Sequence, residues 1–232
     1  MPRMRILNTV ERYDFDSPPA FNPLQRKKYF YFSDTLYHMV SGLRSPAHQV
    51  GFLISCGYFL ATKKFFAANE FRAVDVEYVT QKLGLPDVLV NLHEYNDRTR
   101  QKHQQTILKY YGYQAFSSQA KAFLNEEINI MVRSQLKPRL IFWRCIDLLI
   151  REKVQLPGCF TLTDLITAVI NRRKDQLVNI IQQQLSSEAK QALEALFEQT
   201  PVFGEQHPGA TSAYRLTLLK KLSQSARPAK IK

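Results

Sequence analysis

Glycine, cysteine and acidic residues are all scarce in this chain of 232 residues, and each shortage excludes something. There are only 8 glycines, and apolar residues recur every three or four positions rather than every two, which predicts helices almost throughout. The three cysteines (Cys56, Cys145, Cys159) are odd in number and form no CxxC motif, which excludes a disulfide scaffold and a cysteine-based zinc site. We therefore expect a protein of the reducing cytoplasm.

Long hydrophobic runs are also lacking. The opening stretch, MPRMRILNTVERYDF, has no apolar segment long enough for a signal peptide. The longest uncharged and mostly apolar run, residues 50–62, is too short to span a bilayer. These features predict a soluble protein.

Motifs for catalysis and cofactor binding are missing as well. The sequence contains no GxxxxGK[ST], GxGxxG, HExxH or GxSxG, and its five histidines never lie three or four residues apart. Asp147 is the one acid inside an apolar helical stretch, and we expect it to pair with Arg144 and Arg151. We expect no cofactor, no metal and no enzymatic activity in this chain.

What the sequence does contain is a series of clear helix boundaries. Prolines at positions 23, 46 and 138 follow capping or extended residues and mark helix starts. Glycines at positions 84 and 112 can end helices in a left-handed conformation. The expected helices start near residue 23 and cover residues 33–41, 45–58, 71–83, 97–111, 118–134, 138–153, 161–173, 176–184, 187–199 and 213–222.

These segments predict an all-α, multi-helical fold in two helical lobes with helix-turn-helix-like elements. Residues 15–22 and 200–211 have the composition of loops. We place the boundary near residues 116–118. Residues 1–117 then form an N-terminal helical lobe, and residues 118–232 form a second helical lobe with a basic C-terminal tail.

Basic residues outnumber acidic ones by 32 to 20, giving a formal charge of +12, so the favoured partner is anionic and nucleic acid comes first. On a helix over residues 97–111, Arg98, Lys102, Gln105 and Lys109 form one stripe, a candidate face for phosphates. Arg100 and His103 lie on the side of Ile107 and Tyr111. The alternative is an ordinary solvated helix face.

The expected helices 138–153 and 161–173 have the spacing of a helix-turn-helix. The second helix is expected to expose residues 164, 167, 168, 171 and 174. Thr167 and other short side chains would allow close approach to a groove, Asn171 could read an adenine edge, and Arg172, Arg173 and Lys174 could hold phosphates. The alternative is that the basic residues only complement the helix C-terminus. Residues 2–5 could enter a minor groove, or form a frayed terminus.

Six stretches of the chain, in order, resemble the N-terminal region of the replicative transposases of the Tn-three family of bacterial transposons. They are MPRMRILNTVE, FDSPPAFNPLQRKKYF, LRSPAHQVGFLISCGYFLATKKFF, YNDRTRQKHQQTILKYYGYQAF, QLKPRLIFWRCIDLLIREKVQLPGCFTLTDLI and YRLTLLKKLSQSARPAKIK. Within the fourth stretch, Arg98, Thr99, Arg100 and His103 match the TR..H portion of a recurring family motif.

The resemblance implies a function. Family members are much longer proteins whose N-terminal helical region binds the terminal inverted repeats of the transposon, while an acidic catalytic triad lies far downstream. We therefore expect a fragment without the catalytic domain, from a bacterial cytoplasm and its nucleoid, that binds double-stranded DNA sequence-specifically. The alternative is a helical assembly module that self-associates through aromatics such as Phe65, Phe66 and Tyr110.

The candidate DNA contacts share a basic or short polar side chain on these segments. They are Arg3, Arg5, Lys27, Lys28, Arg98, Arg100, Lys102, His103, Lys109, Thr167, Asn171, Arg172, Arg173, Lys174, Lys220 and Lys221.

Overall fold

The computed structural model describes residues 4–86, 90–197, 199–200 and 213–214, and its fold is all-α, as the sequence predicts. The α-helices are α1 (Thr9–Asp16), α2 (Pro23–Tyr29), α3 (Asp34–Ser41), α4 (Pro46–Thr62), α5 (Ala73–Lys82), α6 (Asp97–Tyr111), α7 (Ser118–Arg133), α8 (Pro138–Arg151), α9 (Cys159–Gln184) and α10 (Ser187–Glu194). Short 3₁₀ turns are η1 (Ala68–Glu70), η3 (Leu92–Glu94) and η4 (Ala195–Phe197). No helix in the described ranges is long and apolar enough to cross a membrane.

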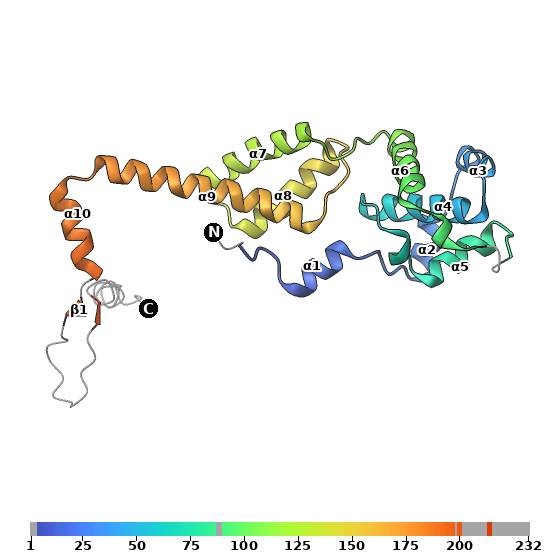
Figure 1. Ribbon diagram of the computed structural model, residues 1–232, viewed down its shortest axis with the longest axis horizontal. Coiled ribbons are helices and arrows are strands. Elements are labelled where there is room, and N and C mark those ends of the chain that lie inside the picture. The colour runs from blue at the N-terminus through green and yellow to red at the C-terminus, as the bar shows by residue number, and fades with distance from the viewer. Residues whose placement is uncertain (1–3, 87–89, 198, 201–212, 215–232) are drawn as a thin grey trace, which may run out of the picture. The chain divides into compact units, whose positions relative to one another are not determined.

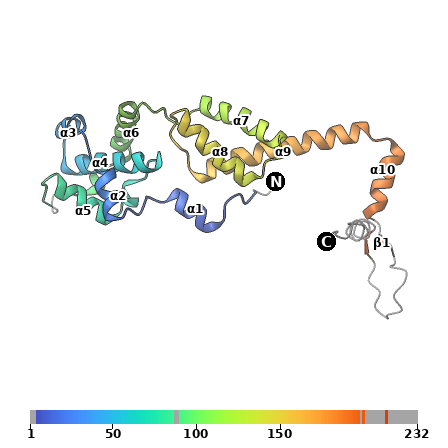
Figure 2. The ribbon, with the colours of Figure 1, turned by 180° about the vertical axis from the view of Figure 1, so that it is seen from behind.

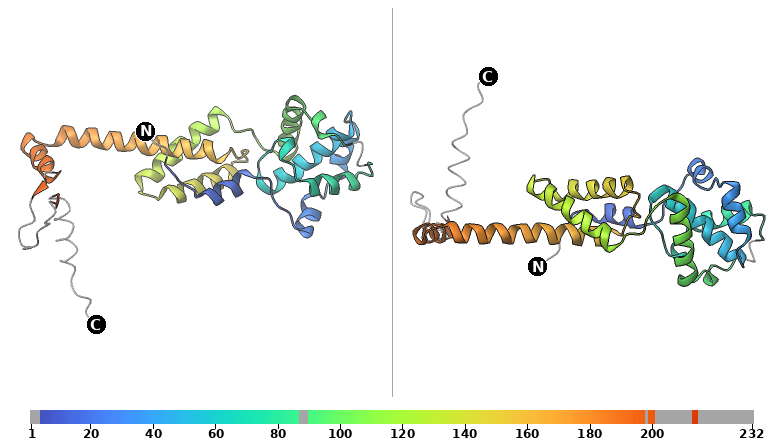
Figure 3. Two further views of the ribbon diagram at one scale, coloured as in Figure 1. Left: turned by 60° about the horizontal axis from the view of Figure 1, so that its bottom comes forward. Right: turned by 90° about the horizontal axis from the view of Figure 1, so that it is seen from above.

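The chain divides into two compact units, Met1–Arg173 and Lys174–Lys232. The first unit contains two hydrophobic cores. They lie in two groups of helices, α2 to α6 in one and α7, α8 and the start of α9 in the other (Figures 1 and 2). One is built on α4, which contacts α2, α3, α5 and α6 (Figure 3). The other joins α7, α8 and the first part of α9 to Ile6 and Leu7 of the N-terminal segment. The expected boundary near residue 117 remains a prediction.

Local capping explains why the helices start and stop where they do. Asn22 and Gln25 form a reciprocal capping box ahead of Pro23, and the Asn96 side chain accepts the backbone N–H of Thr99. Gly112 ends α6 in the left-handed region with φ of 68°, so α6 spans Asp97–Tyr111 as predicted. These caps satisfy backbone groups that the helix ends would otherwise leave unpaired.

The central helix α4 is almost entirely buried because its sequence is apolar on all sides. Gly51 lets the Tyr95 ring approach closely, since a Cβ there would lie 2.6 Å from Tyr95 Cδ1. Gly57 serves the same purpose for Phe30. Glycine at these two positions therefore allows aromatic rings to pack directly on the helix backbone.

A buried acid forms an ion pair inside the core that is built on α4. Asp75 is fully buried, and its carboxylate accepts from Arg26 Nε at 2.7 Å and from the Tyr58 hydroxyl at 2.8 Å. Arg26 also donates to the carbonyl of Phe21. Burial raises the pKa of Tyr58, so its hydroxyl remains a donor. The network ties α2, α4 and α5 together and leaves the acid with partners.

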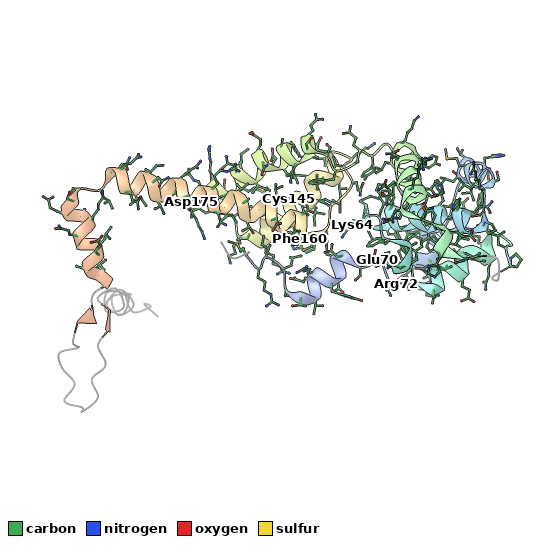
Figure 4. All side chains as sticks on the ribbon, viewed as in Figure 1. Lys64, Glu70, Arg72, Cys145, Phe160 and Asp175 are labelled. Atoms are coloured by element: carbon green, nitrogen blue, oxygen red, sulfur yellow. The ribbon has the colours of Figure 1, made fainter. Side chains whose placement is uncertain are left out.

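The N-terminal segment and the two cores of the first unit meet at Lys64 (Figure 4). Its ammonium donates to the carbonyl of Phe15 at 2.6 Å and to Asp16 Oδ1 at 2.7 Å. Nearby, the backbone N–H of Leu156 donates to the carbonyl of Lys63 at 2.9 Å. These bonds connect the end of α4 with α1 and with the segment between α8 and α9.

Three parts of the structure differ from the sequence prediction. Helix α1 lies where no helix was expected, and it covers the first residues of the expected loop 15–22. Helix α9 is one continuous helix of 26 residues, rather than two helices separated after residue 173. Gln199 and residues 213–214 were expected in helices and Thr200 in a loop, but they form β1 (Gln199–Thr200) and β2 (Ala213–Tyr214), which pair antiparallel.

Candidate nucleic-acid interface

Helix α6 presents the predicted basic stripe to solvent. Arg98, Lys102, Gln105 and Lys109 are all exposed. The spacing of four, three and four residues places them along one side of the helix. The Asn96 cap fixes the start of this helix and Gly112 fixes its end, so the stripe lies on a regular helix of 15 residues.

The opposite side of α6 faces the protein interior, as the sequence predicts. Ile107 is fully buried, and Arg100 is partly buried. The Arg100 guanidinium donates to Asp97 Oδ1 at 2.8 Å and to the carbonyl of Phe66 at 3.4 Å. Its Nε is buried without a hydrogen-bond partner among the described residues. Arg100 therefore joins α6 to the segment that follows α4.

His103 is buried, which corrects its inclusion among the DNA contacts. Its Nδ1 lies 3.1 Å from the Tyr95 hydroxyl, and its ring packs edge-on against Phe52. Burial, with a smaller contribution from His48, lowers the pKa of His103 to about 4. A neutral and enclosed imidazole cannot neutralise a phosphate, so this residue of the TR..H motif supports the fold.

The second candidate element is formed by α8, a connection of seven residues and α9. Ala168 and Arg172 are exposed on α9, and Asn171 and Arg173 are partly exposed. Thr167 was expected at the surface, but it is buried and its hydroxyl donates to the carbonyl of Thr163 at 2.7 Å. Because this hydroxyl already forms a hydrogen bond within α9, we no longer count Thr167 among the candidate DNA contacts.

The remaining candidates lie at separate places. Arg5 is exposed and donates to the Thr9 hydroxyl at 2.7 Å, while the next two residues are buried, so the N-terminal segment is anchored from residue 6 onward. Lys27 and Lys28 are exposed on α2. Lys174 is exposed in the second unit. The three other candidates, Arg3, Lys220 and Lys221, lie outside the described residues.

Arg12 is an exposed arginine that the sequence analysis did not consider. It lies on α1 and lines a cavity together with Arg5. It was missed because α1 itself was not expected. The signal was present in the sequence, since Asn8 and Glu11 have the spacing of a capping box and form one in the structure.

The side chains that would support covalent or metal chemistry are poorly placed for it. Burial raises the pKa of Cys56, and it raises the pKa of Cys145 to about 12. Among the described residues no group of three or more metal-binding side chains comes together. Asp147 was expected to pair with Arg144 and Arg151, but it is exposed, and Arg151 contacts Glu152 at 3.4 Å.

Of the three aromatics proposed for self-association, one is buried and two are partly exposed. Phe66 is buried, and Phe65 is partly buried and stacked on Phe59 with ring centroids 4.8 Å apart. The Tyr110 hydroxyl hydrogen-bonds the Ser33 hydroxyl at 2.8 Å. The assembly alternative stays a prediction.

Comparison with known protein families gives a match over most of the chain. The model of a family described as a domain of unknown function, DUF4158, matches residues 6–169. The matched range begins at the anchored N-terminal segment, contains α1 to α8 and extends into α9. Because this range covers more than half of the chain, the protein belongs to the DUF4158 family.

Proposed function

We propose that this chain binds double-stranded DNA and that the exposed basic stripe of α6 contacts the phosphate backbone. The observation that carries the proposal is the separation of the two faces of this helix. Arg98, Lys102 and Lys109 are exposed together, while Arg100 and His103 are held inside. Each cation that meets a phosphate releases counterions, so such a row favours a duplex backbone.

The DNA is, in this proposal, the terminal inverted repeat of a transposon. Two observations support it. DUF4158 is a domain found in transposases of the Tn-three family, and the stretches of this sequence that resemble those proteins run in the same order as in the family. The chain would then hold transposon ends for a catalytic domain located elsewhere in the transposase, and would not itself cut DNA.

Base recognition in this proposal belongs to α9. Ala168 leaves room for close approach, the partly exposed Asn171 can pair with an adenine edge, and Arg172 can contact the adjacent phosphate. This division gives the two helices different roles. Helix α6 supplies affinity that is independent of sequence, and α9 supplies the preference for one sequence.

A second candidate function is self-association through the second unit. Leu177, Val178, Ile180 and Ile181 are exposed on the last turns of α9. Four exposed apolar side chains within five residues of one helix favour an interaction surface. This surface is a further basis for an assembly role, besides the partly exposed Phe65 and Tyr110.

Fluorescence anisotropy with labelled duplexes tests the proposed function. One duplex carries the inverted repeat that flanks the gene, and the other carries the same bases in scrambled order. We expect tighter binding to the inverted repeat at moderate salt, and Asn171→Ala should reduce that preference. Lys121→Ala, on the exposed surface of α7, is the control. Equal binding to both duplexes would contradict sequence recognition, and sedimentation of the free protein tests self-association separately.

A further inference from the structure

A cavity of about 420 Å³ lies between the N-terminal segment and the start of α9. This volume is within the range of small-ligand sites. The residues lining it are Met4, Arg5, Ile6, Leu7, Asn8, Thr9, Arg12, Cys159, Phe160 and Thr163. The proposed contacts of α6 and α9 with duplex DNA use none of these side chains.

The cavity is cationic on one side. Arg5 and Arg12 are both exposed and line it, and no acid is among its described lining residues. Arginine remains charged at all physiological pH values and offers a planar set of donors that matches phosphate oxygens. Burial and the Asp16 carboxylate raise the pKa of Cys159, a thiol in the cavity wall, and the Arg12 and Lys64 cations offset part of this rise.

An aromatic ring forms another part of the wall. Phe160 projects from the first turn of α9 and is 46% exposed (Figure 4). Buried Ile6 and Leu7 line the same cavity. An exposed ring beside two cations is the combination with which proteins hold unpaired nucleotides, the ring for the base and the cations for the phosphate.

The beginning of α9 does not supply the anion site. The backbone N–H of Cys159 already donates to Asp16 Oδ1 at 2.9 Å, so a carboxylate of the chain occupies that position. An incoming phosphate must therefore bind to the arginine side chains. One N–H of the Arg5 guanidinium donates to the Thr9 hydroxyl, and this bond holds the guanidinium at the cavity wall. Its other N–H groups can donate to a phosphate.

We propose that this cavity binds one unpaired nucleotide of a DNA strand, with its phosphate on Arg5 and Arg12 and its base against Phe160. The nucleotide must be unpaired because the bases of a duplex already stack on one another and cannot offer a face to Phe160. The inference rests on the proposed function only in taking DNA as the partner, and it adds a second kind of contact to the duplex contacts of α6.

The test compares a blunt duplex with the same duplex carrying a single unpaired 2-aminopurine nucleotide at one end. The wild-type protein should bind the second duplex about tenfold more tightly, and stacking should quench the fluorescence of the probe. Phe160→Leu and Arg12→Gln should each abolish the gain and the quenching while binding to the blunt duplex stays unchanged. Tyr31→Leu removes a ring that is 77% exposed elsewhere and should change neither.

A short single strand with one internal 2-aminopurine separates this inference from the proposed function. The blunt duplex could fail to bind while the single strand binds with quenched fluorescence and Phe160→Leu removes the quenching. That result would support the nucleotide cavity and overturn the proposed binding of duplex DNA. If the wild-type protein gains nothing from the unpaired nucleotide and quenches neither probe, the nucleotide cavity is overturned. Adenosine monophosphate that binds as tightly as the strand would overturn the assignment to DNA. Melting temperatures confirm that each variant folds.

Discussion

The ammonium of Lys64 lies 2.7 Å from Oδ1 of Asp16, a residue 48 positions earlier in the chain. The same carboxylate oxygen accepts the backbone N–H of Cys159 at the start of α9. Lys64 Nζ also lies 3.9 Å from the centroid of the Phe15 ring. One lysine and one aspartate thus connect the end of α4, the end of α1 and the start of α9, which come from both cores of the first unit.

Replacing Lys64 should destabilise this connection. Lys64→Met keeps the length of the side chain but removes its donors, and Asp16 then retains its backbone partner. Removing one partner of a fully buried pair costs about 3–5 kcal/mol, and the Asp16 side chain is 37% exposed, so we expect a loss of about 1–3 kcal/mol. Urea unfolding measures it. Lys121→Met is the exposed control, and an equal effect of both variants would contradict the role of Lys64.

Stability should fall as the pH drops from 6.5 toward 4. The pKa of His103 is about 4 in the folded protein and about 6.5 when unfolded, so in this window the unfolded chain binds a proton that the folded one does not. The loss should reach up to about 1.4 kcal/mol per pH unit. His103→Gln should flatten this part of the curve, whereas His38→Gln, at an exposed position, should not. An NMR titration showing an ordinary His103 pKa would refute the burial effect.

Adding one methyl group at Gly51 should be costly. The new Cβ would lie 2.6 Å from Cδ1 of Tyr95, which is buried and holds His103. Overpacking of this kind costs about 1–3 kcal/mol and outweighs the gain in helix propensity. Gly42→Ala is the matched control, because Gly42 has φ of −80° and only an ordinary contact at 3.7 Å. Thermal unfolding that finds Gly51→Ala as stable as the wild type would show that Tyr95 can move freely.

Supplied with Mg²⁺ or Mn²⁺ and transposon-end DNA, the chain should neither nick nor join strands. Two-metal catalysis needs carboxylates held a few ångströms apart around the ions. Asp147 is exposed on α8, and Asp75 is buried with Arg26 and Tyr58. A supercoiled plasmid assay checks this expectation. Metal-dependent cleavage that survives purification and disappears in Asp147→Asn would contradict it.

The helices that the sequence predicts best are those whose ends carry local chemical signals. Asn96 and Gly112 bracket α6, and the structure places its ends at Asp97 and Tyr111. Helix α1 was missed because none of its residues is buried and the capping box of Asn8 and Glu11 was not used as a helix start. The expected break after residue 173 was wrong for a physical reason. No proline or glycine lies between residues 173 and 176, so nothing stops α9 from continuing.

The candidate DNA contacts also show how far local sequence patterns predict the structure. Periodicity alone separates exposed Lys102 and Lys109 from buried His103, because these positions belong to one helix. It fails for Thr167, whose polar side chain suggested exposure although its hydroxyl bonds within the helix. The cavity beside Arg12 and Phe160 depends on two segments about 150 residues apart meeting through tertiary packing, which local patterns do not encode.

The salt dependence of duplex binding by variants of α6 tests the central claim most directly. Affinity is measured for one duplex at several salt concentrations. If Lys102 and Lys109 contact phosphates, replacing each with alanine should lower the magnitude of the log–log slope by about 0.9 and leave the melting temperature unchanged. Arg100→Ala should instead lower the melting temperature. The claim is contradicted if both lysine variants keep the wild-type slope, or if Arg100→Ala retains full stability but loses sequence preference.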